Sequence, residues 1–210
     1  EAFYGRERKA YALYNLPFGD YLFLIKEWFN ARKARRTISP EIDTLSVNYV
    51  FCSPRNNHMN RIYPLFQEMI KEQPCRIWIT DRTILQHIRA EHQMYCVDIC
   101  GQWSKYFKFK DVYRAKKCCR ELRHSMPGLF GQLEFRKIKA YLILFFAWER
   151  FWTEYLGDGV QELYSTFEKS PVLKSCYYTA HQRGVPKRVH WIHGLRHASI
   201  QATLSSELWC

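Results

Sequence analysis

The polar segment Ser53–His58 carries residue types that suit acid–base and anion-binding chemistry. It follows the β-rich run Val47–Cys52 and precedes a helical pattern. His58 could act there as a general base, because an unperturbed histidine titrates near neutral pH. Backbone amides at a helix N-terminus bind anions, and Arg55 and Arg61 add positive charge. The alternative is that the asparagines of the segment and His58 only complete a turn and cap the helix.

A second polar segment, Ser165–Ser170, also follows a β-rich run and precedes a helical pattern. The carboxylate of Glu168 could accept a proton or bind substrate hydroxyls, and Ser165 and Thr166 add hydroxyl groups near it. The alternative is structural, because an acidic residue just before a helix also suits the positive end of the helix dipole. The segment therefore indicates either a substrate site or an N-terminal cap.

A third candidate lies near the end of the chain, where the β-rich run Arg188–Ile192 is followed by His193, Gly194 and then His197. Side chains alternate along a strand, so His190 and His193 are expected on opposite faces. We interpret His190 as a buried core residue. His193 falls where the strand ends and Gly194 permits a sharp turn, so these two residues and His197 are candidates for substrate binding.

The order of elements predicts how these segments are brought together. Strands are expected at 47–52, 76–80, 94–100, 162–166, 188–192 and 207–210, with helical stripes between most of them. Ser170 and Pro171 predict a helix start, and Gly184 predicts its end. Strands that alternate with helices predict an α/β fold with a parallel sheet. Ligands of such sheets gather at the carboxyl ends of the strands, where the three polar segments fall.

Two further helices are expected outside the sheet. One spans 18–36, and it belongs to a helical segment, residues 1–44, that precedes the sheet domain of residues 45–210. The other spans 134–156 and is rich in aromatic residues. Its apolar residues lie on nearly every side of the helix, so we expect it to be deeply buried or to contact another surface.

The composition favours an anionic partner. The 210 residues carry a formal net charge of +12, and 47% are hydrophobic, so the chain can bury a sizeable core. Basic clusters at 32–36, 105–117 and 136–139 are mixed with aromatics, which suits a nucleic-acid surface, an anionic membrane interface or a solvated face. We find no RNA-recognition, zinc-finger or helix-turn-helix signature, and no P-loop or GxGxxG motif.

The eight cysteines form no CxxC pair, and several lie in apolar runs. We therefore expect reduced thiols of a cytoplasmic protein and no bound metal. The longest apolar run, Ala140–Trp148, is far shorter than the roughly 20 residues that span a bilayer.

Two motifs resemble a known family. The Gly184-Val185-Pro186 turn, the following strand and Ile192-His193-Gly194 resemble the end of the N-terminal domain of bacterial GT-B glycosyltransferases of the capsule and lipopolysaccharide type, including the Kdo transferases. The segment Ser53–His58 resembles the first β–α unit of that family. The resemblance covers about residues 45–210, and Ile192 stands where the family often has Gln.

The resemblance implies a Rossmann-like sheet that forms the acceptor-binding half of a GT-B enzyme, whose C-terminal nucleotide-sugar domain is then missing from these residues. The implied donor is a nucleotide sugar such as CMP-Kdo, with no other cofactor. The implied acceptor is a glycan or lipid-linked saccharide, reached from the cytoplasm, with peripheral binding to the anionic inner membrane. His58 and Glu168 are the implied catalytic candidates. The implied substrate-binding residues are Arg55, Asn57, Arg61, Ser165, Thr166, His193, Gly194 and His197.

Three other functions stay open. One is another sugar-nucleotide enzyme of the same fold, such as an epimerase or a glycerophosphotransferase. Another is a basic α/β module that binds nucleic acid, although no nucleic-acid partner is favoured. The last is a non-catalytic interaction domain.

Overall fold

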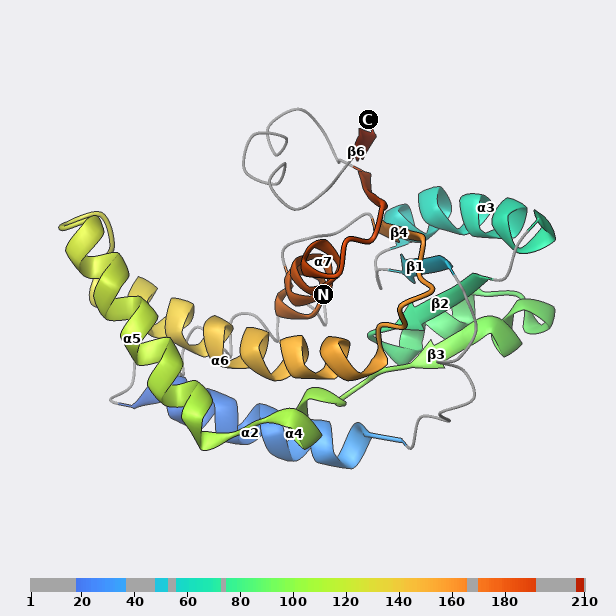
Figure 1. Ribbon diagram of the computed structural model, residues 1–210. Helices are drawn as coiled ribbons and strands as arrows, with labels where there is room; N and C mark the ends of the chain where they lie inside the picture. The colour runs from blue at the N-terminus through green and yellow to red at the C-terminus, as the bar shows by residue number, and fades with distance from the viewer. Residues whose placement is uncertain are drawn as a thin grey trace. The chain divides into compact units, whose positions relative to one another are not determined.

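The computed structural model describes residues 18–36, 48–52, 56–72, 75–165, 170–191 and 207–209. The chain forms two compact units (Figure 1). One, here called the helical unit, consists of Glu1–Ala34 and Gly101–Trp148. The other, the sheet unit, consists of Arg35–Cys100 and Glu149–Cys210. The expected boundary between residues 44 and 45 therefore differs from this division, because residues 101–148 join the N-terminal helix rather than the sheet.

The sheet unit contains six strands in the order β3-β2-β1-β4-β5-β6, and every neighbouring pair is parallel. The predicted α/β fold with a parallel sheet is confirmed. The strands are β1 (Asn48–Cys52), β2 (Cys75–Ile79), β3 (Cys96–Asp98), β4 (Glu162–Ser165), β5 (Lys187–Trp191) and β6 (Glu207–Trp209). β3 is shorter than expected, because Met94 and Tyr95 belong to a preceding 3₁₀ turn.

The connections of the sheet unit are set by local capping. α3 (Asn56–Glu72) links β1 to β2, and the 3₁₀ helices η2 (Arg82–His87) and η3 (Ala90–Tyr95) link β2 to β3. The Asp81 carboxylate starts η2 by accepting a bond from the Thr83 amide at 2.9 Å. α7 (Pro171–Gln182) links β4 to β5, and the Ser170 hydroxyl accepts a bond from the Leu173 amide at 3.4 Å. Gly184 follows α7 with φ +71°, as predicted for a C-terminal cap.

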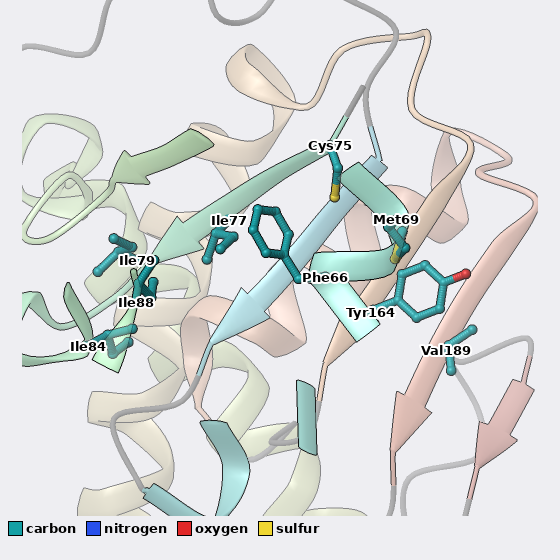
Figure 2. Close-up of a cluster of buried hydrophobic side chains, with 9 residues drawn as sticks. All are labelled: Phe66, Met69, Cys75, Ile77, Ile79, Ile84, Ile88, Tyr164 and Val189. Atoms are coloured by element: carbon teal, nitrogen blue, oxygen red, sulfur yellow. The ribbon is translucent and has the colours of Figure 1, made fainter. Parts of the chain in front are cut away.

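One face of the sheet is covered by α3 and η2. Every second residue of β2 packs against side chains from these helices (Figure 2). The helix side chains are Phe66 and Met69 of α3, Ile84 of η2, and Ile88, which directly follows η2. The strand residues of this cluster are Cys75, Ile77, Ile79, Tyr164 and Val189. The alternation follows from the pleat of the strand, which sends neighbouring side chains to opposite faces.

The other face is covered by α7 and by the end of α6 (Gln132–Tyr155). Trp78 of β2 packs edge to face against Phe151 and Trp152 of α6, and all three are fully buried. The Trp152 indole N–H donates to the Val172 carbonyl of α7 at 2.8 Å. The Tyr177 hydroxyl of α7 donates to the Val189 carbonyl of β5 at 2.5 Å. Because α3 and α7 cover opposite faces, the sheet is doubly wound.

The helical unit consists of α2 (Gly19–Ala34), α4 (Trp103–Tyr106), α5 (Phe109–Ser125) and the part of α6 before Glu149. Its core is formed by Leu24, Ala115, Ala140, Ile143 and Phe146. Of the two alternatives for the aromatic helix, this core supports burial for Ala140, Ile143 and Phe146, whereas Leu142, Leu144 and Phe145 beside them are only partly buried.

Two polar features hold the helical unit together. Asp20, at 2% exposure, forms an ion pair with Lys139. Burial alone would lower the pKa of Lys139, but its hydrogen bond to Asp20 and the nearby charges outweigh that effect and raise the pKa above its ordinary value. Asp111 is also buried and accepts a bond from the Lys108 amide at 2.9 Å, which caps α5. Among the described helices, none is long and apolar enough to cross a membrane.

Candidate ligand site at the carboxyl edge of the sheet

The strand order reverses between β1 and β4: β1 to β3 extend the sheet to one side, and β4 to β6 extend it to the other. β1 and β4 are neighbours in the sheet although they are far apart in sequence. The helix after β1 and the helix after β4 cover opposite faces, so the two connections leave the edge in opposite directions. In open α/β sheets, ligands bind outside the carboxyl ends of the strands at this reversal. The described residues next to this reversal, at the start of α3 and at the end of β4, therefore define the candidate site.

On the β1 side, the structure changes the expected local conformation. Residues 56–58 were expected in a loop, but α3 already begins at Asn56, so Asn57 and His58 lie in its first turn. Arg61 lies in the second turn, and Arg55 falls outside the described residues. Residues 56–58 contain neither glycine nor proline, so the helix can extend back through them from the apolar stripe. The first turn of a 17-residue helix presents free backbone amides, which suits an anionic group.

On the β4 side, Ser165 is the last residue of the strand and is only 2% exposed. It pairs in register with Phe51 of β1 and with His190 of β5. Its hydroxyl is therefore a buried group at the sheet edge rather than an open binding group. Thr166 and Glu168, the other candidates of this segment, fall outside the described residues.

On the β5 side, His190 lies inside the strand and is 3% exposed. Its expected place in the core is confirmed. His193, Gly194 and His197 fall outside the described residues. Of the candidate residues, the structure thus brings the backbone of Asn57, His58 and Arg61 and the side chain of Ser165 to one region of the sheet unit.

Sequence reasoning missed an ion pair at the ends of β2 and β3. The Arg82 Nε donates to Asp98 Oδ2 at 2.6 Å, and Asp98 Oδ1 accepts a bond from the Cys100 amide at 2.9 Å. This hydrogen bond to Asp98 is the main reason that the pKa of Arg82 is raised above its ordinary value. Asp98 is the last residue of β3, but the expected strand 94–100 placed it inside a strand, so the rule of a polar residue at a strand end did not single it out.

No protein-family model, curated protein sequence or solved structure matches this chain. The chemistry of the site therefore has to be judged from its own residues.

Four of the described thiols, those of Cys75, Cys96, Cys100 and Cys176, are poor nucleophiles at neutral pH. Burial raises the pKa of Cys75, Cys96 and Cys100 to about 12, and it raises that of Cys176 well above its ordinary value. The thiol rather than the reactive thiolate is then the form present at pH 7. Within the described ranges, no group of three or more His, Cys, Asp or Glu side chains is placed to hold a metal ion.

The donors at this edge suit an anionic group. The first turn of α3 offers backbone donors, and the charges of Arg82 and Asp98 lie at the ends of the next strands along the sheet. The Arg82 and Asp98 side chains keep 35% and 21% of their surface exposed. They can therefore reach solvent at the edge while they stabilise each other.

Proposed function

We propose that the sheet unit is the acceptor-binding half of a GT-B glycosyltransferase of bacterial surface-glycan synthesis. The strand order β3-β2-β1-β4-β5-β6 with all strands parallel carries the proposal, because it is the order of Rossmann-like domains and both halves of a GT-B enzyme have that architecture. The resemblance of the 184–194 segment to the end of the family's N-terminal domain adds support at the level of sequence.

The place of His58 supports its assignment as a general base. It lies in the first turn of α3, directly after the strand that borders the reversal of the sheet. Acceptors of this enzyme class carry phosphate or carboxylate groups, and a helix N-terminus stabilises such charges. An acceptor anion bound by the first-turn amides would hold the acceptor hydroxyl in the same region as His58.

The proposed reaction is displacement at the anomeric carbon of a nucleotide sugar. The base, His58 or Glu168, takes the proton of the acceptor hydroxyl while its oxygen forms a bond to the anomeric carbon. The bond between that carbon and the phosphate oxygen breaks, and the nucleotide leaves with the electron pair. The donor is a nucleotide sugar, with CMP-Kdo among those to test, and it binds on a C-terminal half.

The test is sugar transfer by the protein purified from its complete gene. UDP-, GDP- and CMP-linked sugars are supplied with lipid-linked saccharides, and the mass of the acceptor and the release of nucleotide are measured. We expect the acceptor to gain one sugar in step with nucleotide release. Absence of acceptor-dependent transfer from every donor would contradict the proposal, and conversion of the donor without transfer would favour an epimerase instead.

Matched histidine variants test the site. We expect His58→Ala to lower kcat at least about 100-fold, the usual contribution of a general base. The control is His181→Ala, because His181 is exposed in the last turn of α7 and so lies toward the opposite end of the sheet unit. Equal activity of the two variants would remove His58 from the mechanism. The corresponding substitution Glu168→Gln then decides whether the carboxylate is the base.

A further inference from the structure

Helix α2 exposes a row of large apolar side chains. Leu22, Ile25 and Phe29 are 45%, 54% and 56% exposed, and Phe18, directly before the helix, is 74% exposed. Leu22, Ile25 and Phe29 are spaced by three and four residues, so they lie on one side of the helix. We call these four residues the α2 stripe. Single exposed apolar residues are common, but a continuous row of them marks an interaction surface.

The opposite side of α2 is its packing side. Asp20, Leu24 and Ala31 are buried there. Glu27 follows Leu24 by three residues and precedes Ala31 by four, so it belongs to the same side. Both acidic residues of α2 are therefore directed away from the α2 stripe.

Within α2, the charged residues that border the α2 stripe are all cationic. Lys26 and Lys33 are exposed, and by helical spacing they border the stripe on one side. Arg32 is exposed and borders it on the other side, with its guanidinium 4.7 Å from the centre of the Trp28 ring. The outward side of α2 thus combines aliphatic and aromatic side chains with a positive border.

The net charge of the chain is also concentrated in this unit. The helical unit contains seventeen lysines and arginines and seven aspartates and glutamates, whereas the sheet unit contains fifteen and thirteen. The helical unit therefore carries nearly all of the net charge of +12. A partner of the α2 stripe has to be apolar where it meets the stripe and anionic around it.

We propose that α2 binds in the plane of an anionic lipid bilayer, with Phe18, Leu22, Ile25 and Phe29 in the acyl boundary and Lys26, Arg32 and Lys33 at the headgroups. A helix of 16 residues is about 24 Å long and lies on the surface rather than crossing it. A nucleic acid would use the cations but would leave Leu22 and Ile25 without a partner. A second copy of the chain would bring like charges together, which opposes self-association through this side.

The experiment is flotation of the purified protein with vesicles of phosphatidylcholine alone or with 30% phosphatidylglycerol. We expect binding to the anionic vesicles, and at least tenfold weaker binding to the neutral ones. The variant Ile25→Ser/Phe29→Ser should lose at least tenfold in vesicle affinity, and Lys26→Gln/Lys33→Gln should lose a similar factor at low salt. Both substitutions are on exposed positions, and circular dichroism verifies that each variant is folded.

The matched control is Met94→Ser/Leu129→Ser, which removes two apolar side chains that are 78% and 65% exposed but lie outside α2. It should bind vesicles like the unchanged protein. The proposal is overturned if the protein ignores anionic vesicles, if the α2 variant binds as well as the control, or if an oligonucleotide or an acidic protein binds while vesicles do not. Vesicle binding needs no sugar transfer, so this experiment tests the membrane proposal independently of the proposed enzyme activity.

Discussion

Trp78 and Trp152 pack edge to face at the centre of one sheet face, with their ring centres 4.8 Å apart. Trp78 comes from the middle of the sheet and Trp152 from the last turns of α6, and neither has any exposed surface. The indole N–H of Trp152 also bonds the first turn of α7 through the Val172 carbonyl. This one side chain therefore joins a strand and two helices of the sheet unit.

We predict that Trp152→Phe destabilises the protein by about 2 kcal/mol or more. It leaves the buried Val172 carbonyl without its donor and opens a cavity beside Trp78. Urea unfolding followed by circular dichroism measures the loss. The control Trp28→Phe removes an N–H bond of 3.3 Å to the Ser104 carbonyl at a half-buried site, and it should cost clearly less. Equal losses would show that the Val172 bond contributes little.

The Arg183 side chain caps the C-terminal end of α6. Its guanidinium donates to the carbonyls of Thr153, at 2.5 Å, and Leu156, and it pairs with Asp158 at 3.2 Å. We predict that Arg183→Ala lowers the free energy of unfolding by about 1–3 kcal/mol, because two terminal carbonyls lose a charged donor. Arg183→Lys should recover only part of the loss, since one ammonium cannot serve both carbonyls in the same planar geometry. Asp158→Ala should cost little, because that carboxylate is 98% exposed.

Gly101 approaches α2 so closely that no side chain fits. A Cβ there would lie 2.3 Å from the Ala31 carbonyl oxygen, and φ is +73°. We predict that Gly101→Ala costs several times more stability than Gly128→Ala in a thermal melt. Gly128 has a similar φ of +78° but nothing within 4 Å of an added Cβ, so only the backbone strain remains, at about 1 kcal/mol. Similar losses at the two positions would show that α2 can move aside.

Alkaline pH should destabilise the protein through its buried thiols. Burial raises the pKa of Cys75 to about 12 in the folded chain, from an ordinary value of 9.0. Between these values the unfolded chain loses the thiol proton and the folded chain keeps it, so the free energy of unfolding falls as pH rises above about 9. The stabilisation is complete below that pH. One such thiol contributes a slope of up to about 1.4 kcal/mol per pH unit.

Urea unfolding at a series of pH values from 8 to 10.5 measures this slope. The comparison is Cys75→Val, which keeps a small apolar side chain in β2 without a titrating group. Its slope should be shallower than that of the unchanged protein. Identical slopes would show that Cys75 does not contribute to the alkaline loss.

Local signals in the sequence predicted most of the individual elements. Ser170, Pro171 and Gly184 marked both ends of α7, and the β-rich runs marked six strands. Alternation with helices was enough to predict a parallel sheet. These signals succeed because caps, turns and side-chain periodicity depend on residues that are close in sequence.

The candidate site was only partly predictable. The rule that polar residues at strand ends form ligand sites placed Asn57, His58 and Ser165 at the sheet, but it gave no warning that Ser165 is buried. It also did not bring out the pair of Arg82 and Asp98, which lie sixteen residues apart and meet only when β2 and β3 align. Exposure and ion pairing depend on neighbours in space, which a local pattern does not contain.

From the sequence alone, the α/β class, the approximate limits of the strands and of α2, α6 and α7, and the excess of positive charge could be predicted. The tertiary structure decided the strand order, the grouping of residues 101–148 with the N-terminal helix, and the division of α2 into a packing side and an exposed apolar stripe. The periodicity of α2 could not reveal this division, because apolar residues occur on both sides of the helix. Only packing against the rest of the helical unit shows which of the two apolar sides is buried and which is left for a partner.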